Sequence, residues 1–372
     1  MGAQISLGRI WGIPVGLHWS LLLVFALLTW SLADGFLLGR NPELDLTARW
    51  VIAVLTSVFF FASILLHELG HAWVAQRNGI PVNRITLFIF GGAAEIDKQA
   101  KTPGVEFRVA VGGPVVSLAL AASFGVLAVA TQNVAVLGAS FFWLAQINLM
   151  LLLFNLVPGY PLDGGRMLRA AVWHFTKSER RATTVAMFSG QIVAFGLMAI
   201  GGYLIFSGNF INGIWLIFIG WFLQNATVAE QSSATVQQQL AGIKVGQAMG
   251  MIKEPRVPSR LKIQQLVDDY ALPHGQRTFL VMDDEVPRGL VTLRNLAQVP
   301  RERWAWASVT EAMTPWSELT KVTPDIDLIE AMKLMDDQRV GQVPVVDGTR
   351  VVGLLTREEI IHLLRLRMEL GS

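Results

Sequence analysis

Cysteine is absent from this 372-residue sequence, and charged residues are scarce, at 16% of the chain. Without cysteine the chain can form no disulfide, thiolate metal site or cysteine nucleophile, so any bound metal must rely on His, Asp or Glu. The formal net charge is only +2, too small for a surface that neutralises many phosphates, and no nucleic-acid partner is expected. Hydrophobic residues make up 52% of the chain and its mean hydropathy is +0.47, a balance typical of a membrane protein.

Six long runs that are nearly free of charge fill the first part of the chain, and charged residues crowd the part after about Lys244. Each run is long enough to cross about 30 Å of hydrocarbon as a helix. We therefore predict an all-α six-span transmembrane domain with a small membrane-associated β segment, followed by a soluble α/β module. The first run could also be a signal peptide, but its length favours a span. The predicted spans are 10–33, 50–75, 109–130, 134–157, 182–206 and 211–229.

Lys and Arg are concentrated in two of the loops between the predicted spans. The loop between spans two and three and the loop between spans four and five carry five basic residues each, whereas the loops after residues 130 and 206 carry none. Cytoplasmic loops retain basic residues in membrane proteins. We therefore expect a multi-pass protein of the cell membrane, with both termini and the soluble module in the cytoplasm.

The second predicted span contains the sequence HELGH, with His67, Glu68 and His71 on what periodicity indicates is a helix. His67 and His71 project from the same face, where two imidazoles can hold one zinc ion. Glu68 lies about 100° round the helix and can reach a water on the metal. A charged residue inside a span costs on the order of 2.5 to 3.5 kcal/mol, so such residues usually mark function. We therefore predict a metal site and not a chance polar surface.

The fourth predicted span ends in NLVPGYPLDGG, residues 155–165. A catalytic zinc needs a third protein ligand and an open position, and Asp163 is a candidate. Taken alone, the Pro and Gly content indicates a helix end followed by a turn, with Asp163 as a turn former and Asn155 as a helix-packing residue. The residues by themselves leave both interpretations open.

HExxH in an early span together with NxxPxxPLDG at the end of a later one resembles the two-part signature of the site-2 proteases. The resemblance covers roughly residues 10–228. It implies a zinc ion bound by His67, His71 and Asp163. It further implies that Glu68 is the general base and that Asn155 positions the substrate or stabilises the oxyanion. The implied activity is that of an intramembrane zinc endopeptidase that cuts transmembrane segments of membrane-tethered regulators, such as anti-sigma factors.

Two adjacent glycines and a proline, residues 112–114, interrupt the third predicted span. Such residues are tolerated in membrane helices, where they permit kinks or close helix contacts. We expect one of these packing roles and assign the three residues no chemistry.

A β-prone segment, residues 84–96, follows the second span. A peptide in a membrane needs backbone hydrogen-bond partners when it unwinds, and an enzyme strand can supply them by strand addition. We predict a strand or hairpin beside the zinc, in which Ile89, Phe90, Gly91 and Gly92 clamp the extended substrate. An ordinary structural hairpin is the open alternative.

The soluble part contains two copies of one sequence pattern, which align at a constant offset. VGQAM at 245–249 aligns with VTEAM at 309–313, and GLVTLRNL at 289–296 aligns with GLLTREEI at 353–360. An internal duplication is the simplest explanation. The predicted organisation is a membrane domain at 1–229, a Ser- and Gln-rich linker at 230–243, and two repeats at 244–300 and 301–372.

Each repeat combines an amphipathic helix, short β runs and a closing helix, and resembles a cystathionine-beta-synthase (CBS) domain. Paired CBS domains often bind adenine nucleotides, which makes Thr292 and Thr356 candidate nucleotide contacts. The ribose-binding pattern GxxTxxD is broken, because Asn295 and Glu359 stand at the acidic positions. A purely structural module, or one that forms a homodimer, is an equal alternative.

Two other functions compete with proteolysis. A CBS-gated membrane transporter or channel for a metal ion is the main alternative, because paired CBS domains also regulate transport proteins. It does not explain why the polar residues in the spans are HExxH and a distant Asp at a membrane boundary. An inactive scaffold is the third interpretation, and the complete constellation argues against it.

Overall fold

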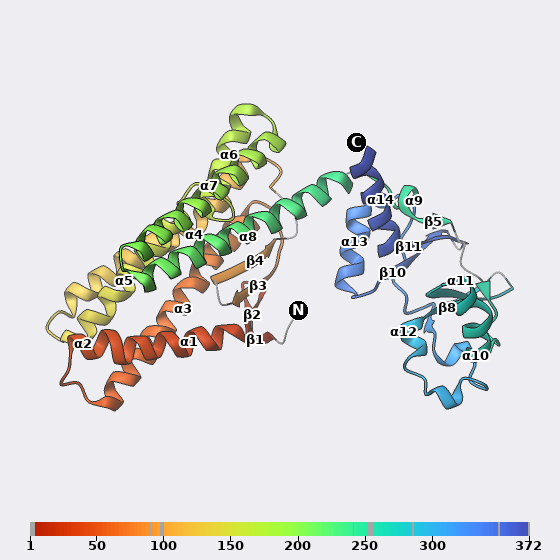
Figure 1. Ribbon diagram of the computed structural model, residues 1–372, viewed down its shortest axis with the longest axis horizontal. Coiled ribbons are helices and arrows are strands. Elements are labelled where there is room, and N and C mark those ends of the chain that lie inside the picture. Colours follow the sequence, from red (N-terminus) through yellow and green to blue (C-terminus); the bar gives the residue numbers. More distant parts are fainter. Residues whose placement is uncertain are drawn as a thin grey trace. The chain divides into compact units, whose positions relative to one another are not determined.

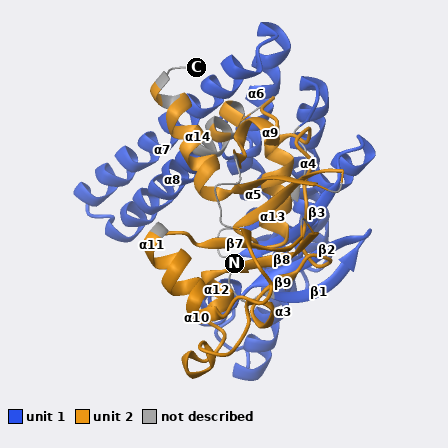
Figure 2. Ribbon diagram, turned by 90° about the vertical axis from the view of Figure 1, so that its right-hand side faces the viewer, with its two compact units in different colours: residues 1–231 blue, residues 232–372 orange. Residues whose placement is uncertain are grey.

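The computed structural model describes residues 4–88, 91–96, 100–240, 242–251, 256–284, 286–348 and 350–370. The chain forms two compact units, residues 1–231 and residues 232–372 (Figure 2). The helix α8 (Phe210–Leu240) continues from the sixth span through most of the segment expected to be a linker.

The first unit is built mainly from long helices, with strands close to its N-terminus and after its second span (Figure 1). In chain order its other elements are β1 (Gln4–Ile10), β2 (Ile13–His18), α1 (Ser20–Trp30), η1 (Ser31–Leu37), α2 (Leu38–Arg40), α3 (Leu46–Arg77), β3 (Val82–Phe88), β4 (Gly91–Ile96), α4 (Pro103–Ala130), α5 (Ala135–Asn155), α6 (Asp163–Thr176) and α7 (Glu179–Phe206).

Within the part of the chain that the structure describes, six helical segments are long and apolar enough to cross a membrane. This confirms the predicted six-span architecture. The segments are Ser20–Arg40, Leu46–Arg77, Pro103–Ala130, Ala135–Asn155, Glu179–Phe206 and Phe210–Ala229.

The prediction for the first span is wrong over residues 10–19. Residues 10–18 belong to the hairpin of β1 and β2, and helix begins only at Ser20. Pro14 cannot donate a backbone hydrogen bond within a helix, and Val15 is β-branched. The decisive factor is non-local, because β2 pairs in parallel with β3, with Val15 opposite Ile85. An apolar run alone cannot distinguish such a buried strand from a helix.

The four strands form one sheet in the order β1-β2-β3-β4. In this sheet the side chains of Ile13, Val15 and Ile85 are buried. One hydrophobic core contains Ile13 of β2 and Ile85 of β3 together with Leu69 and Ala72 of α3. The β segment is therefore larger than predicted, and it packs against the turn of α3 that carries HELGH.

Helices α3 and α4 approach each other closely beside that turn. A Cβ atom on Gly70 of α3 would lie only 2.6 Å from the carbonyl oxygen of Gly112 on α4. The two backbones can be this near because both positions lack a side chain. The expected close helix contact at residues 112–114 therefore occurs.

The second unit contains short helices and strands, with a longer helix at its end. In chain order they are α9 (Val245–Ala248), β5 (Gly250–Met251), β6 (Arg256–Val257), α10 (Ile263–Gln265), η2 (Leu266–Ala271), α11 (Leu272–His274), β7 (Thr278–Asp283), β8 (Val286–Thr292), α12 (Leu293–Leu296), η3 (Arg301–Arg303), η4 (Val309–Glu311), β9 (Thr314–Pro315), α13 (Leu328–Asp337), β10 (Gln342–Asp347), β11 (Arg350–Thr356) and α14 (Arg357–Leu370).

The structure repeats at the offset seen in the sequence. β10 and β11 occupy the places in the second repeat that β7 and β8 occupy in the first. Both antiparallel hairpins have the same register, with Thr278 opposite Thr292 and Gln342 opposite Thr356. A short strand near the start of each repeat pairs with the hairpin of the other repeat. β5 of the first repeat pairs with β11 of the second, and β9 of the second pairs with β8 of the first. Each sheet of the second unit therefore contains one strand from the other side of residue 300, the predicted boundary between the repeats.

Candidate metal centre

Three predicted ligands converge inside the first unit. His67 and His71 of α3 and Asp163, the first residue of α6, each offer one ligand atom, and these atoms lie within 4.8 Å of one another. The two Nε2 atoms are 3.2 Å apart, and Oδ2 of Asp163 lies 3.2 Å from each of them. All three residues are buried. Among the described residues, no other group of three His, Asp or Glu side chains has this spacing.

Helix α4 holds the other nitrogen of each imidazole. Nδ1 of His71 lies 2.7 Å from the carbonyl oxygen of Val109. A carbonyl can only accept, and this contact is shorter than the 3.3 Å from the Gly113 amide, so Nδ1 carries the hydrogen and Nε2 presents a lone pair. Nδ1 of His67 lies 2.8 Å from Oγ of Ser117. Such outer contacts orient metal-binding histidines and fix their tautomer.

The spacing and chemistry of these donors fit zinc. Ligand atoms about 2.0 to 2.1 Å from a tetrahedral zinc are about 3.3 Å from one another, close to the observed separations. Metal binding needs an ionised carboxylate and imidazole lone pairs, and Asp163, His67 and His71 offer these donors at the observed separations. Two imidazoles and one carboxylate leave one position of a tetrahedral ion open.

Gly113 brings the backbone of α4 against both imidazoles. A Cβ atom at this position would lie 2.2 Å from Nε2 of His71 and 2.5 Å from Nε2 of His67. Any side chain would therefore occupy the space between the donors. The sequence alone assigns Gly113 no chemistry, and this is the residue of the site that it misses. Paired glycines inside a span do signal a close backbone approach, but they do not say what approaches.

The loop between α5 and α6 delivers Asp163 to the histidines. The hydroxyl of Thr227 on α8 lies 2.8 Å from the carbonyl of Tyr160 in this loop and 2.8 Å from that of Leu223 in its own helix, and its one hydrogen is shared between these two acceptors. Gly190 of α7 leaves room for the carbonyl oxygen of Tyr160, because a Cβ atom at position 190 would lie only 2.2 Å from that oxygen. Asn155 is the last residue of α5 and is half-buried. Its contact with substrate stays a prediction.

Glu68 faces the predicted hairpin. β3 and β4 form that hairpin, with Phe88 opposite Gly91, whereas Ile89 and Phe90 lie outside the described residues. A Cβ atom on Gly92 would lie 2.3 Å from Cγ of Glu68 and 2.9 Å from its Oε1. β4 is also the last strand in the sheet order, so no described strand pairs with its outer edge. The hairpin therefore lies beside the predicted general base, and its function as a clamp stays a prediction.

The predicted nucleotide contacts of the second unit lie in one open cleft of about 1430 Å³, which is lined by Thr292, Thr356 and several arginines. Each threonine caps the helix that follows it. The hydroxyls of Thr292 and Thr356 accept from the backbone amides of Asn295 and Glu359, each at 3.2 Å. In return, the side chains of Asn295 and Glu359 accept from the backbone amides of the two threonines. The two residues that break the ribose-binding pattern are thus partners in helix capping.

Two protein families match the two parts of the chain. Peptidase family M50 matches residues 55–139 and 125–199, and the CBS domain family matches residues 309–366. Two proteins named "Putative zinc metalloprotease", Rip3 from Mycobacterium tuberculosis and sll0528 from Synechocystis, are 37% and 34% identical to this chain. Both alignments cover 98% of this chain, with 93% of Rip3 and 96% of sll0528. A solved site-2 protease from Methanocaldococcus jannaschii is 27% identical and covers 61% of this chain and 95% of its own, with a TM-score of 0.42.

Proposed function

This chain belongs to peptidase family M50 as a zinc metalloprotease of the site-2 type, and we propose that it cleaves transmembrane segments of membrane-tethered regulatory proteins close to the cytoplasmic face. The convergence of His67, His71 and Asp163 carries the proposal, because three donors 3.2 Å apart inside a membrane unit suit one metal ion. Membership of a peptidase family favours hydrolysis over the alternative of a CBS-gated metal transporter.

In this proposal His67, His71 and Asp163 hold the zinc ion, which when bound supplies a Lewis acid and lowers the pKa of water. The carbonyl of Val109 and the hydroxyl of Ser117 keep the imidazoles in the ligating orientation. Glu68 takes the proton of the attacking water and later gives a proton to the leaving amine. Asn155 donates from its side-chain amide to the oxyanion of the scissile carbonyl.

The substrate helix must unwind before its carbonyls can react. We propose that the outer edge of β4 binds the extended substrate by strand addition, with Ile89, Phe90, Gly91 and Gly92 as the clamp. The contact between Gly92 and Glu68 supports this, because a peptide paired with β4 runs next to the general base. The outer edge of β4, which no described strand covers, supports it as well.

The remaining assignments concern orientation and regulation. The distribution of Lys and Arg supports cytoplasmic termini and a cytoplasmic CBS pair in a multi-pass membrane protein. We propose that the CBS pair binds an adenine nucleotide beside Thr292 and Thr356 and joins two chains into a homodimer. Titration of the detergent-purified full chain with AMP and with ATP tests the nucleotide. Absence of binding at millimolar concentration would leave the module a structural role.

The deciding experiment compares membrane-protein fragments in cells that carry the wild-type chain or Glu68→Gln. New termini inside transmembrane segments, found only with the wild type, would identify the substrate, which we expect to be a membrane-tethered regulator such as an anti-sigma factor. The substitution should lower turnover by about 10²- to 10⁴-fold and leave one zinc per chain. Glu43→Gln, which changes an exposed loop residue, is the matched control. Undiminished cleavage by Glu68→Gln would contradict the proposal.

A further inference from the structure

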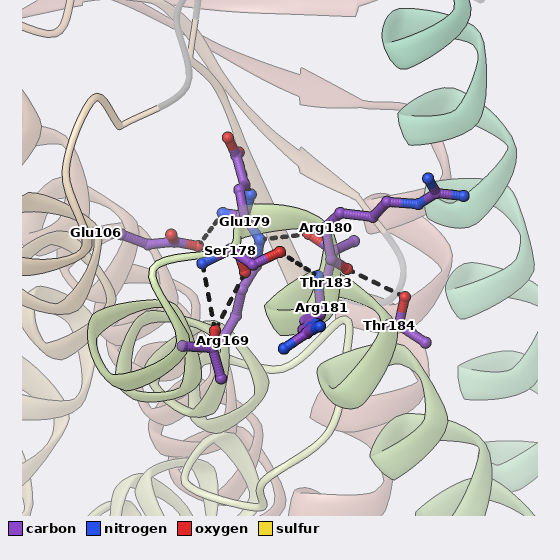
Figure 3. Close-up of polar contacts among 9 residues, drawn as sticks. Glu106, Arg169, Ser178, Glu179, Arg180, Arg181, Thr183 and Thr184 are labelled. Atoms are coloured by element: carbon purple, nitrogen blue, oxygen red, sulfur yellow. Dashed lines mark hydrogen bonds and ion pairs between the residues drawn. The ribbon is translucent and has the colours of Figure 1, made fainter. Parts of the chain in front are cut away.

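Helix α6 carries a second buried charged residue besides Asp163. Arg169 lies further along the same helix, about 9 Å from Asp163 at 1.5 Å per residue, and is only 8% exposed. Its guanidinium donates to three side chains of two other helices. Nη1 donates to Glu106 of α4 at 2.6 Å, and Nη2 and Nε donate to Glu179 and Thr183 of α7. Figure 3 shows these partners converging on Arg169.

Glu106 is the innermost partner of this arginine. It is 2% exposed, and its second oxygen, Oε2, has no hydrogen-bond partner among the described residues. Arg169 therefore supplies the positive charge that balances the buried carboxylate of Glu106. Arginine suits this task, because its planar fork can contact partners on two helices at once, whereas a lysine is a single point charge.

Glu106 also lies on the face of α4 that holds the histidines. Val109, Gly113 and Ser117 follow it at intervals of three or four positions, so the four residues share one face of the helix. Val109 and Ser117 contact the Nδ1 atoms of His71 and His67, and Gly113 lies against both rings. The bond from Arg169 to Glu106 thus joins the helix that begins with Asp163 to the helix that orients both imidazoles.

A buried ion pair is weak support for stability alone, because desolvation offsets much of the attraction between the charges. Its best-attested use is to hold elements in one register. For α6 the register matters, because zinc sites tolerate ligand distances only within about 0.2 Å of their usual values.

We propose that Arg169 is a positioning residue of the metal centre, which holds α6 on α4 and α7 so that Asp163 meets His67 and His71. This inference rests on the proposed function only through the assignment of Asp163 as the third ligand. It differs from a simple packing role in one measurable respect. Loss of the bonds from Arg169 should weaken zinc binding even where the protein stays folded.

Zinc affinity provides the test, measured by competition with a chelator on the full chain in detergent. Arg169→Gln and Glu106→Gln should each lower the affinity by about 10- to 100-fold, the usual effect of residues that orient metal ligands. Arg169→Lys should fall between these variants and the wild type, because lysine can keep Glu106 but not all three partners. Arg180→Gln removes the same charge from an exposed position on α7 and should leave the affinity within about twofold of the wild type.

Saturating zinc should restore turnover in Arg169→Gln, because the catalytic groups are intact once the ion is bound. Zinc affinities of Arg169→Gln and Glu106→Gln equal to that of Arg180→Gln would overturn the proposal. If neither of those variants folds, Arg169→Lys and Glu179→Gln carry the test with the same control, and wild-type affinity in both would also overturn it. Failure of the proposed function is a separate result, in which the wild type binds zinc but Glu68→Gln changes no cleavage.

Discussion

Substitution of Gly113 by alanine tests the metal centre most directly. The new Cβ atom would lie 2.2 Å from Nε2 of His71, and real Cβ contacts essentially never fall below 3.0 Å. The imidazole must therefore retreat by about 0.8 Å, four times the deviation of about 0.2 Å that zinc ligands tolerate. His67 must move as well, because its Nε2 would lie at 2.5 Å.

We expect Gly113→Ala to weaken zinc binding by at least about 100-fold, which is near 2.8 kcal/mol at 1.4 kcal/mol per factor of ten. Zinc content and chelator competition on the purified protein measure this loss, and cleavage should fall with it. Gly125→Ala in the same helix is the control, because nothing lies within 4 Å of its added Cβ atom. Alanine favours a helix over glycine by about 1 kcal/mol, so neither change should unfold α4. One tightly bound zinc in Gly113→Ala would refute the reasoning.

Three further substitutions probe other parts of the chain. Gly92→Ala should lower turnover by about 100-fold, since its Cβ atom would displace Glu68, while one zinc per chain remains bound; unchanged turnover would contradict this. Thr227→Val removes the hydrogen bond to the carbonyl of Tyr160 and should cost about 1 kcal/mol in thermal unfolding, with weaker zinc binding. Burial raises the pKa of Glu359 above its usual 4.5, so ionisation of this residue destabilises the folded second unit. Glu359→Gln should raise the unfolding temperature at pH 7 by an amount that fades as the pH falls towards 4.5; an equal gain at both pH values would be inconsistent with this cause.

The sequence by itself determined the number of spans and the division into two parts. Both follow from local composition, because a helix that crosses hydrocarbon must be apolar along its whole length. HELGH placed His67 and His71 on one helix face for the same local reason. The repeat offset found in the sequence also reappears in the hairpins of the second unit.

Only the tertiary structure decided which of these elements meet. Residues 10–18 form strand instead of helix because β3, which follows the whole of α3 in the chain, offers a pairing partner. Asp163 lies 3.2 Å from both histidines although more than 90 residues separate it from them in the chain, and Gly113 matters because α4 crosses α3 at the metal site. Strand pairing, helix crossing and buried ion pairs join residues far apart in the chain, whereas hydropathy and helical periodicity describe only neighbours.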